Sequence, residues 1–552
     1  MVRCAAVVVA TVLTLAGCVG IPSQGGVMTG SVFNDDDAFP FAVLPSDPQQ
    51  GASQQEILTD FMQAATSPEG NYEIARKFLT RGAADSWNPG ASVLIREGSG
   101  TLVPSSADSL DYGVSTRASV NAAGLYTEDR EQATQRLPFV FEKVDEQWRI
   151  SALQDGIVLS RDNFEAAFDQ HALYFFDPTY RYLIPDVRWF PSRSNVPARI
   201  VNAMLDGQAT WLQQGATLTA FPVGTKLQPP LEVRSGRVTV DLSEEVANTS
   251  NLEKARMQRQ LEASLGTVSV NTVTMSVRSV PIVVADPGVS NATLTPLVDS
   301  DALVRLGGEF GFATASGLAP IGSVSAKIVG VDARAVTLAA RQRSAAVLGA
   351  EGAYLVTAED DTALLVDGRP GLIAPSIDTW RYVWSAPAAA ATALLATGPD
   401  LVQHEITSTL PANATLVSLD VSRDGARVLL YLNSDAGPQL KVAAILRRGG
   451  VPAGLGEPID LPVSADLPLD ASWVDDRTVV ALAAANGRQT VTEFTIGGPL
   501  VGLGNADGGI SIVGGNGTEQ IRVRAADGTI LQRRTSGWQV TGLVADVLAT
   551  QQ

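Results

Sequence analysis

The chain has 552 residues, of which 45% are apolar and 18% charged, and its formal net charge at pH 7 is −18. This length exceeds what one hydrophobic core holds and predicts about three domains of roughly 100 to 250 residues. The acidic balance argues against a nucleic-acid partner, because phosphate binding depends on Lys and Arg. Beyond the N-terminal segment, no uninterrupted apolar run reaches the about 18 residues of a spanning helix, so we expect no membrane span in the body of the chain.

The N-terminus has the pattern of an export signal. Arg3 precedes a run, Cys4 to Leu15, that contains only apolar residues and Thr and is too short to span a bilayer. The run ends in Leu15-Ala16-Gly17-Cys18, which resembles the lipobox of bacterial lipoproteins. This resemblance implies that residues 1–17 are a signal peptide and that Cys18 carries an S-diacylglycerol group and, as a further option, an N-acyl group such as palmitate.

The alternative is an ordinary signal peptide with a chance cysteine. Cleavage before Cys18 would also remove Cys4, the other cysteine of the chain, so no internal disulfide could form. A lone free thiol is unusual in an exported protein, and lipidation explains it. Two acyl chains anchor a protein stably at about 0.8 kcal/mol per buried methylene.

Residues 18–48 are predicted to be a flexible tether, because Gly and Pro recur along them. The acidic triplet Asp35-Asp36-Asp37 is interpreted as solvated linker, with a contact site as the less favoured alternative.

Residues 49–170 predict an N-terminal α+β domain. Ser53 followed by Glu56 is a capping-box pattern at the start of an amphipathic helix. A second helix is expected from Tyr72 to Leu79, stopped at Gly82. Residues 137–144 and 148–153, joined by a turn, predict a β-hairpin. Helices followed by strands favour a helix-backed curved sheet of cone-like form, which can hold a small ligand, although a structural or docking role is favoured.

Residues 171–290 predict a second α+β domain. The aromatic run 173–190 could stack on sugars or bases, but a buried strand pair is the favoured interpretation. A helical face ends at Gly207, and residues 252–265 form an amphipathic pattern. The remaining predicted strands are 218–227, 236–243 and 268–277.

Residues 293–552 predict an all-β propeller. Segments 418–432 and 470–484 share one layout, in which an apolar strand meets an Asp-containing turn and a β-branched strand follows. The suggested equivalent positions are Val336, Tyr382, Val428, Val479 and Ile521, at intervals of 46, 46, 51 and 42 residues. Such a spacing matches a propeller blade, and radial repetition leaves few open strand edges.

Several segments carry a resemblance to known proteins. The sequences IVNAMLDGQATWL, AFPVGT, VTVDLS and QLEASLGTVSVNTVTMSV resemble a GerMN domain, and VSRDG resembles the blade turn of TolB-like propellers. Together with the lipobox and LIPDVRWFP, the chain is similar to the LpqB lipoprotein family of actinobacteria. The resemblance implies an N-terminal domain, a GerMN domain and a C-terminal β-propeller. It also implies a partner: the extracellular domain of the sensor histidine kinase MtrB in the MtrAB two-component system.

Residues that could carry chemistry are sparse. The two histidines, His171 and His404, fall in different predicted domains, and His171 is interpreted as a packed core residue rather than a metal ligand. No nucleophile elbow, phosphate loop or H-E-x-x-H occurs, and Gly502 to Gly509 is interpreted as a loop. We therefore expect no catalytic residue, metal or cofactor and no enzyme activity. Hydrolysis by a pair of carboxylates is the weakest alternative.

The favoured hypothesis is a non-enzymatic lipoprotein on the extracytoplasmic face of the cell membrane. It would modulate the kinase through protein contacts and so affect envelope homeostasis and cell division. The alternative is a lipoprotein that binds peptidoglycan or another envelope polymer.

Overall fold

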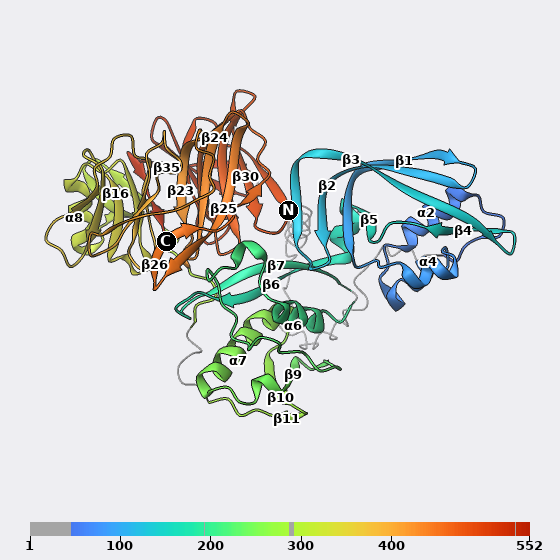
Figure 1. Cartoon of the computed structure of the whole chain (residues 1–552). Helices are drawn as coiled ribbons and strands as arrows, with labels where there is room; N and C mark the ends of the chain where they lie inside the picture. The colour runs from blue at the N-terminus through green and yellow to red at the C-terminus, as the bar shows by residue number, and fades with distance from the viewer. Residues whose placement is uncertain (1–45, 193, 286–291, 536) are drawn as a thin grey trace, which may run out of the picture. The chain divides into compact units, whose positions relative to one another are not determined.

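The computed structural model describes residues 46–192, 194–285, 292–535 and 537–552 (Figure 1). The predicted signal peptide, Cys18 and nearly all of the predicted tether lie outside these residues. Within them, no helix is long and apolar enough to cross a membrane. The expected multidomain organisation is confirmed: an α+β region, a second α+β region and a strand-rich propeller follow one another along the chain.

The N-terminal region packs short helices against a five-stranded sheet. The strand order is β4-β3-β2-β1-β5, with β5 parallel to β1 and the other pairs antiparallel. Bulges interrupt the β1–β2 and β2–β3 ladders, and bulges bend strands. The elements are α2 (Gln54–Ala64), η2 (Glu69–Asn71), α3 (Glu73–Arg76), α4 (Arg81–Ser86), β1 (Ser92–Ser106), β2 (Ser109–Asn121), β3 (Tyr126–Val144), β4 (Gln147–Ala152), β5 (Ile157–Ser160) and α5 (Arg161–Ala167).

Local sequence signals predict part of this region correctly. The capping box is confirmed: Ser53 Oγ accepts from the Glu56 amide, and the Glu56 carboxylate accepts from the Ser53 amide at 2.7 Å. The predicted hairpin is confirmed as β3 and β4. The predicted second helix is wrong in its extent, because α3 spans only four residues and Gly82 lies inside α4. Thr80 caps α4 through its side chain, and this local bond starts a new helix where glycine suggested a stop.

The middle region consists of a strand pair followed by a small sheet with two helices. The aromatic run forms β6 and β7, which pair in antiparallel register and are largely buried, so the strand-pair interpretation is confirmed. The small sheet has the order β11-β10-β9-β8, with β9 and β10 parallel. The elements are β6 (Phe168–Phe176), β7 (Leu183–Pro191), α6 (Val196–Asp206), η3 (Thr210–Leu212), β8 (Val233–Arg234), β9 (Arg237–Leu242), η4 (Glu244–Val246), α7 (Asn251–Leu265), η5 (Gly266–Val268), β10 (Thr272–Val277) and β11 (Val280–Pro281).

Two strand predictions in this region need correction. Residues 218–227 form no strand and make only isolated bridges at Leu218 and Leu227. A Pro and a Gly inside this segment break the regular ladder. The strand expected from residue 268 begins at Thr272, because η5 and a left-handed Ser269 precede it.

The C-terminal region contains six sheets in its described residues (Figure 1). Their strand orders are β14-β13-β12-β36, β18-β17-β16-β15-β37, β19-β20-β21-β22, β23-β24-β25-β26 with β27 beside β25, β28-β29-β30-β31, and β32-β33-β34-β35.

The bounds of the first half are β12 (Leu303–Leu306), β13 (Glu309–Thr314), β14 (Gly317–Ala319), α8 (Gly322–Gly330), β15 (Ala335–Leu338), η7 (Ala340–Gln342), β16 (Ser344–Leu348), β17 (Ala353–Thr357), β18 (Leu364–Asp367), β19 (Ser376–Ile377), β20 (Val383–Ser385), β21 (Leu395–Thr397) and β22 (Gln403–Glu405). Those of the second half are β23 (Thr415–Val421), β24 (Arg427–Ser434), β25 (Gly437–Arg448), β26 (Val451–Leu455), β27 (Ile459–Leu461), β28 (Leu467–Trp473), β29 (Thr478–Ala485), β30 (Arg488–Thr495), β31 (Leu500–Asn505), β32 (Gly509–Val513), η8 (Thr518–Gln520), β33 (Arg522–Ala525), β34 (Thr529–Arg534), β35 (Gly537–Val544), β36 (Val547–Leu548) and β37 (Thr550–Gln551).

The sheets succeed one another in a closed ring. The sheets adjoin through β15, β19, β23, β28, β32 and β36, each of which lies beside the next. These are edge strands except β15, which lies next to the edge strand β37. Strand β36 pairs with β12, and β37 pairs with β15, so the last described strands complete the first two sheets. The repeat suggested by the sequence is confirmed. Each of its five positions lies on, or one residue before, the second strand of a sheet, when the strands are counted from β37, β19, β23, β28 and β32.

The Asp-containing turns between first and second strands are stabilised by ion pairs and by hydrogen bonds from backbone amides to the Asp carboxylates. Asp424 Oδ2 accepts from Arg427 Nη2 at 2.5 Å, and both side chains are buried. Asp378 Oδ2 likewise accepts from Arg447 Nη2 of the neighbouring sheet, at 2.5 Å.

The loop interpretation of Gly502 to Gly509 is wrong at both ends, because Gly502 lies in β31 and Gly509 begins β32.

Removal of the Ser53 cap should weaken α2. We expect Ser53→Ala to cost about 1 kcal/mol, because the Glu56 amide loses its acceptor. Amide hydrogen exchange in the first turn of α2 should therefore be about fivefold faster. Ser67→Ala is the matched control, since no side-chain hydrogen bond of Ser67 is recorded among the described residues. Equal exchange in both variants would contradict the prediction.

Candidate functional site

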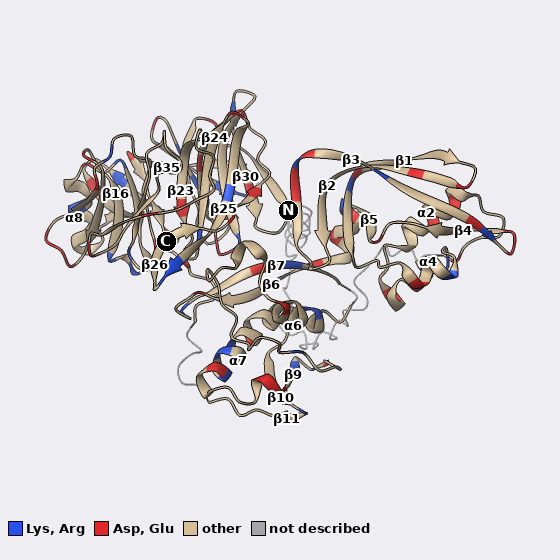
Figure 2. Cartoon of the chain, viewed as in Figure 1, with Lys and Arg blue, Asp and Glu red and all other residues tan. Residues whose placement is uncertain are grey.

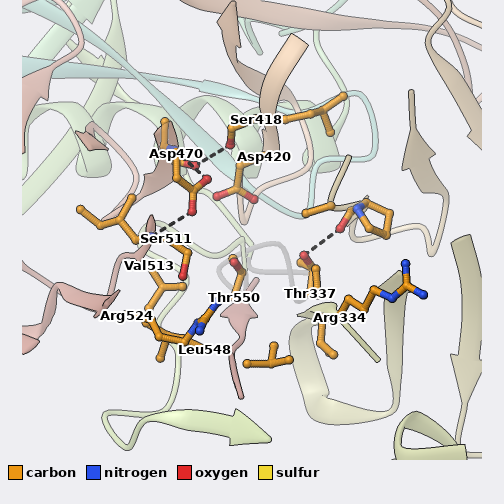
Figure 3. A pocket seen from close by; sticks show the side chains of 18 residues that line it. Arg334, Thr337, Ser418, Asp420, Asp470, Ser511, Val513, Arg524, Leu548 and Thr550 are labelled. Carbon is orange, nitrogen blue, oxygen red and sulfur yellow. Dashed lines mark hydrogen bonds between the residues drawn. The ribbon is translucent and has the colours of Figure 1, made fainter. Parts of the chain in front are cut away.

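A small polar pocket lies among the first strands of the propeller sheets (Figure 3). Its volume is about 120 Å³. Carboxylates, hydroxyls and two arginines contribute to it, and Figure 3 shows Asp420 and Asp470 next to Ser418 on one side. The polar lining residues are Arg334, Thr337, Ser418, Asp420, Asp470, Ser511, Arg524 and Thr550.

Asp420 on β23 has every oxygen engaged. Its Oδ1 accepts from Gln552 Nε2 at 2.7 Å and from Ser376 Oγ at 3.3 Å. Its Oδ2 accepts from Ser472 Oγ at 3.0 Å and from the Trp473 amide at 3.1 Å. Because these donors come from β19, β28 and the segment after β37, Asp420 connects three parts of the ring.

Asp470 on β28 makes the corresponding connection one sheet further. Its Oδ1 accepts from the Ala471 amide and its Oδ2 from the Ile512 amide on β32, each at 2.9 Å. Ser418 Oγ donates to the Ala471 carbonyl at 3.0 Å and links β23 to β28 beside it. Through these hydrogen bonds, Asp420 and Asp470 each connect one sheet to the next at the inner edges of the ring.

Burial dominates the electrostatics of this pair. Removal from water raises the pKa of Asp420 to about 6, although the Trp473 amide and Ser472 hydroxyl favour its charged form. Burial likewise raises the pKa of Asp470 to about 6, and the nearby charge of Asp420 adds to the effect. Neither carboxylate forms an ion pair within the described part of the chain.

The geometry favours a structural role for this pocket. A hydrolytic carboxylate pair needs oxygens directed at a substrate and space for a sugar ring and water. Here the oxygens are directed at backbone amides, hydroxyls and a side-chain amide. The volume is also below the about 300 Å³ from which small-molecule sites usually begin. The pocket is therefore a hydrogen-bonded seam between sheets.

The sequence carries a signal for this pair of acids. Both acids belong to a Leu-Asp-x-Ser motif, Leu419 to Ser422 and Leu469 to Ser472, in the first strands of consecutive sheets. Asp420 lies one residue before the end of β23, and Asp470 lies three residues before the end of β28. An acid repeated within apolar first strands indicates a buried, hydrogen-bonded role.

Neither of the two histidines singled out from the sequence lines this pocket. Cys18 lies outside the described residues. His171 on β6 is buried and stacks on Phe190 at 6.0 Å between ring centroids, and burial lowers its pKa. His404 on β22 meets the edge of Tyr382, also at 6.0 Å. In the described ranges no group of three or more His, Cys, Asp or Glu side chains could hold a metal ion.

Charged residues of both signs are distributed along all three regions (Figure 2). Acidic residues outnumber basic ones by 58 to 40 in the whole chain. No strand or helix in Figure 2 carries a continuous basic row of the kind that tracks a phosphate backbone.

Asp420→Asn should reduce the pH dependence of propeller stability. Between about pH 4 and 6 the folded chain keeps a proton on Asp420 that the unfolded chain has released, so stability falls as pH rises through this window. Asn cannot ionise, and its amide can donate to Gln552 Oε1, which has no partner in the described structure. In urea unfolding followed by circular dichroism, we expect the fall to shrink by an amount on the order of 2 kcal/mol.

Asp420→Ala is the contrasting variant. It leaves four donors without their acceptor and should destabilise the propeller by roughly 3 kcal/mol near pH 4. The loss should be smaller at pH 7, because ionisation of the buried Asp420 has by then already lowered the stability of the parent chain. An unchanged pH slope in Asp420→Asn would show that this carboxylate does not titrate in the window.

Comparisons with known proteins assign each region. Residues 47–165 match the family model "Lipoprotein LpqB, N-terminal domain", residues 172–283 match "Sporulation and spore germination", and residues 301–548 match "Lipoprotein LpqB beta-propeller domain".

Curated relatives agree with this assignment. The relative from Thermobifida fusca, named Lipoprotein LpqB, is 32% identical over 42% of this chain, and the match spans 39% of the relative's length. The Cutibacterium acnes protein of that name is 30% identical over 48% of the chain and 44% of its own length. The one from Rhodococcus opacus is 23% identical over 88% of this chain and 85% of its own. The three family models match successive regions of the chain, and these curated relatives are all named Lipoprotein LpqB. The chain therefore belongs to the LpqB lipoprotein family.

Proposed function

We propose that the protein is a lipid-anchored lipoprotein of the extracytoplasmic membrane face that modulates the MtrAB two-component system by contacting the extracellular domain of its sensor kinase. The observation that carries the proposal is the sequence Leu15-Ala16-Gly17-Cys18 in a chain of the LpqB family. The kinase as partner follows from the family resemblance. The output affected would be envelope homeostasis and cell division.

The described structure supports a role through surface contacts. The oxygens of Asp420 and Asp470, the two carboxylates of the propeller pocket, accept hydrogen bonds from neighbouring strands, so neither acid is free for chemistry. The absence of a spanning helix in the described residues leaves membrane attachment to the predicted lipid. GerMN-like and propeller regions then present broad surfaces to a protein partner.

Tethering provides the mechanism. Two acyl chains on Cys18 keep the body at the membrane, and a flexible segment lets it reach a neighbouring protein. Effective concentrations on the order of millimolar then allow a weak contact to be occupied. A contact that favours one conformation of the kinase shifts its population in proportion to the difference in affinity between its states.

The anchor is tested by fractionation and mass spectrometry. We expect the native chain in the membrane fraction with lipid on Cys18, and Cys18→Ala in the soluble fraction. Cys4→Ala is the matched control, because Cys4 lies in the segment that cleavage would remove, and it should leave anchoring unchanged. Equal membrane retention of Cys18→Ala would contradict the proposal.

The partner is tested by crosslinking in intact membranes. Kinase peptides should be recovered with the native chain and be depleted at least tenfold with Cys18→Ala. Recovery of bound muropeptides without kinase peptides would instead support the envelope-polymer alternative.

A further inference from the structure

The N-terminal region encloses a cavity of about 350 Å³ between α2 and the sheet. This volume lies in the range of small-molecule sites. Its walls come from α2, β1, β2, β5 and the start of α5. The lining residues are Leu58, Thr59, Met62, Gln63, Thr66, Arg96, Ser99, Gly100, Leu102, Tyr112, Val158, Ser160 and Asn163.

A wide bulge in β1 shapes one wall. Glu97 pairs with Ser115 and Thr101 pairs with Gly113, so residues 98–100 oppose Val114 alone. Bulges often occur beside binding sites, where they redirect side chains. The bulge carries Ser99 and Gly100 to the cavity wall.

Gly100 lets the ring of Tyr112 lie against β1. A Cβ atom at residue 100 would come within 2.3 Å of the Tyr112 hydroxyl oxygen and still closer to the ring. Any larger residue would therefore displace the ring. The backbone is shaped to hold a tyrosine at this wall of the cavity.

Arg96 is the only charged residue among those that line the cavity. Its Nη1 donates to the Gly98 carbonyl, and no carboxylate of the described residues forms an ion pair with it. Arg161 nearby differs, since it is paired with Glu97 at 3.0 Å and with Glu128 at 3.2 Å. The guanidinium of Arg96 thus keeps donors free in a chain whose net charge is −18.

Neutral polar groups line the cavity with Arg96. No hydrogen-bond partner within the described chain is recorded for the side-chain ends of Gln63, Ser99, Tyr112 and Asn163. Tyr112 is 8% exposed, and burial raises the pKa of its hydroxyl, which therefore remains a donor at neutral pH. Leu58, Met62, Leu102 and Val158 supply apolar surface.

We propose that this cavity binds a small organic carboxylate, whose anionic group contacts Arg96 and Tyr112 while its apolar part lies against Leu58, Met62 and Val158. An unpaired guanidinium beside a hydroxyl donor matches a carboxylate in charge and geometry. A cationic ligand would meet Arg96 with no acid among the lining residues to offset the repulsion. A neutral apolar ligand would leave the guanidinium without an acceptor.

The test is calorimetric titration of the full chain carrying Cys18→Ala, so that no attached acyl chain competes for the cavity. Octanoate is the probe, with octylammonium and 1-octanol as probes of equal chain length and different charge. We expect saturable 1:1 binding of octanoate, at least about tenfold weaker binding of octanol, and no saturable binding of octylammonium.

Two variants locate the site. Arg96→Gln should weaken octanoate binding by roughly 10-fold to 100-fold, and Tyr112→Phe, which retains the ring, by a few-fold. Arg136→Gln is the matched control, because Arg136 lies on β3 with 79% of its side chain exposed and does not line the cavity. It should bind octanoate as the parent does. Circular dichroism checks that each variant is folded.

The outcomes separate clearly. The proposal is overturned by a lack of saturable octanoate binding, by octylammonium binding as tightly as octanoate, or by an Arg96→Gln affinity equal to that of the parent chain. Because the anchor and the kinase contact play no part in this titration, its result is independent of the proposed function.

Discussion

Closure of the propeller ring is the constraint on which the C-terminal half of the molecule depends. An open sheet edge exposes unpaired amides and carbonyls, and a ring of sheets leaves only short edges of this kind. Here β36 pairs with β12 and β37 pairs with β15, so residues from the two ends of the region share sheets. Joining distant segments costs loop-closure entropy, and the ladder bonds and buried first strands offset that cost.

Buried acids stabilise the same ring from inside. Asp420 and Asp470 accept donors from neighbouring sheets, and Asp378 pairs with Arg447 across another junction. A buried carboxylate is costly when it lacks partners, so each of these positions is stable only while the sheets keep their relative placement. The raised pKa values of Asp420 and Asp470 show that hydrogen bonds offset the loss of water only in part. The propeller pocket is therefore polar because its acids connect neighbouring sheets of the ring.

The cavity of the N-terminal region has the opposite character. In the propeller pocket both carboxylates accept hydrogen bonds from neighbouring strands. Around Arg96 no acid lines the cavity, and several side-chain donors and acceptors have no protein partner in the described residues. Gly100 leaves room for the Tyr112 ring, and the three-residue bulge beside it borders a cavity of about 350 Å³ that ordinary packing would fill. A region that has satisfied its core elsewhere has no structural need for such a space, and ligand binding accounts for it.

Local chemistry was enough to predict much of the fold. The Ser53–Glu56 capping box, the β3–β4 hairpin and the repeat of the propeller all depend on residues close together in the chain, and the structure confirms them. The family resemblance likewise came from contiguous segments. The low helix propensity of glycine led to a wrong prediction at Gly82. This residue lies inside α4, because the Thr80 side chain caps a new helix just before it. Only the tertiary structure decided that Asp420 and Asp470 meet between sheets and that Arg96 and Asn163 line one cavity. Residues far apart in sequence come together through sheet order and bulges, and these depend on the packing of the whole region rather than on any single segment.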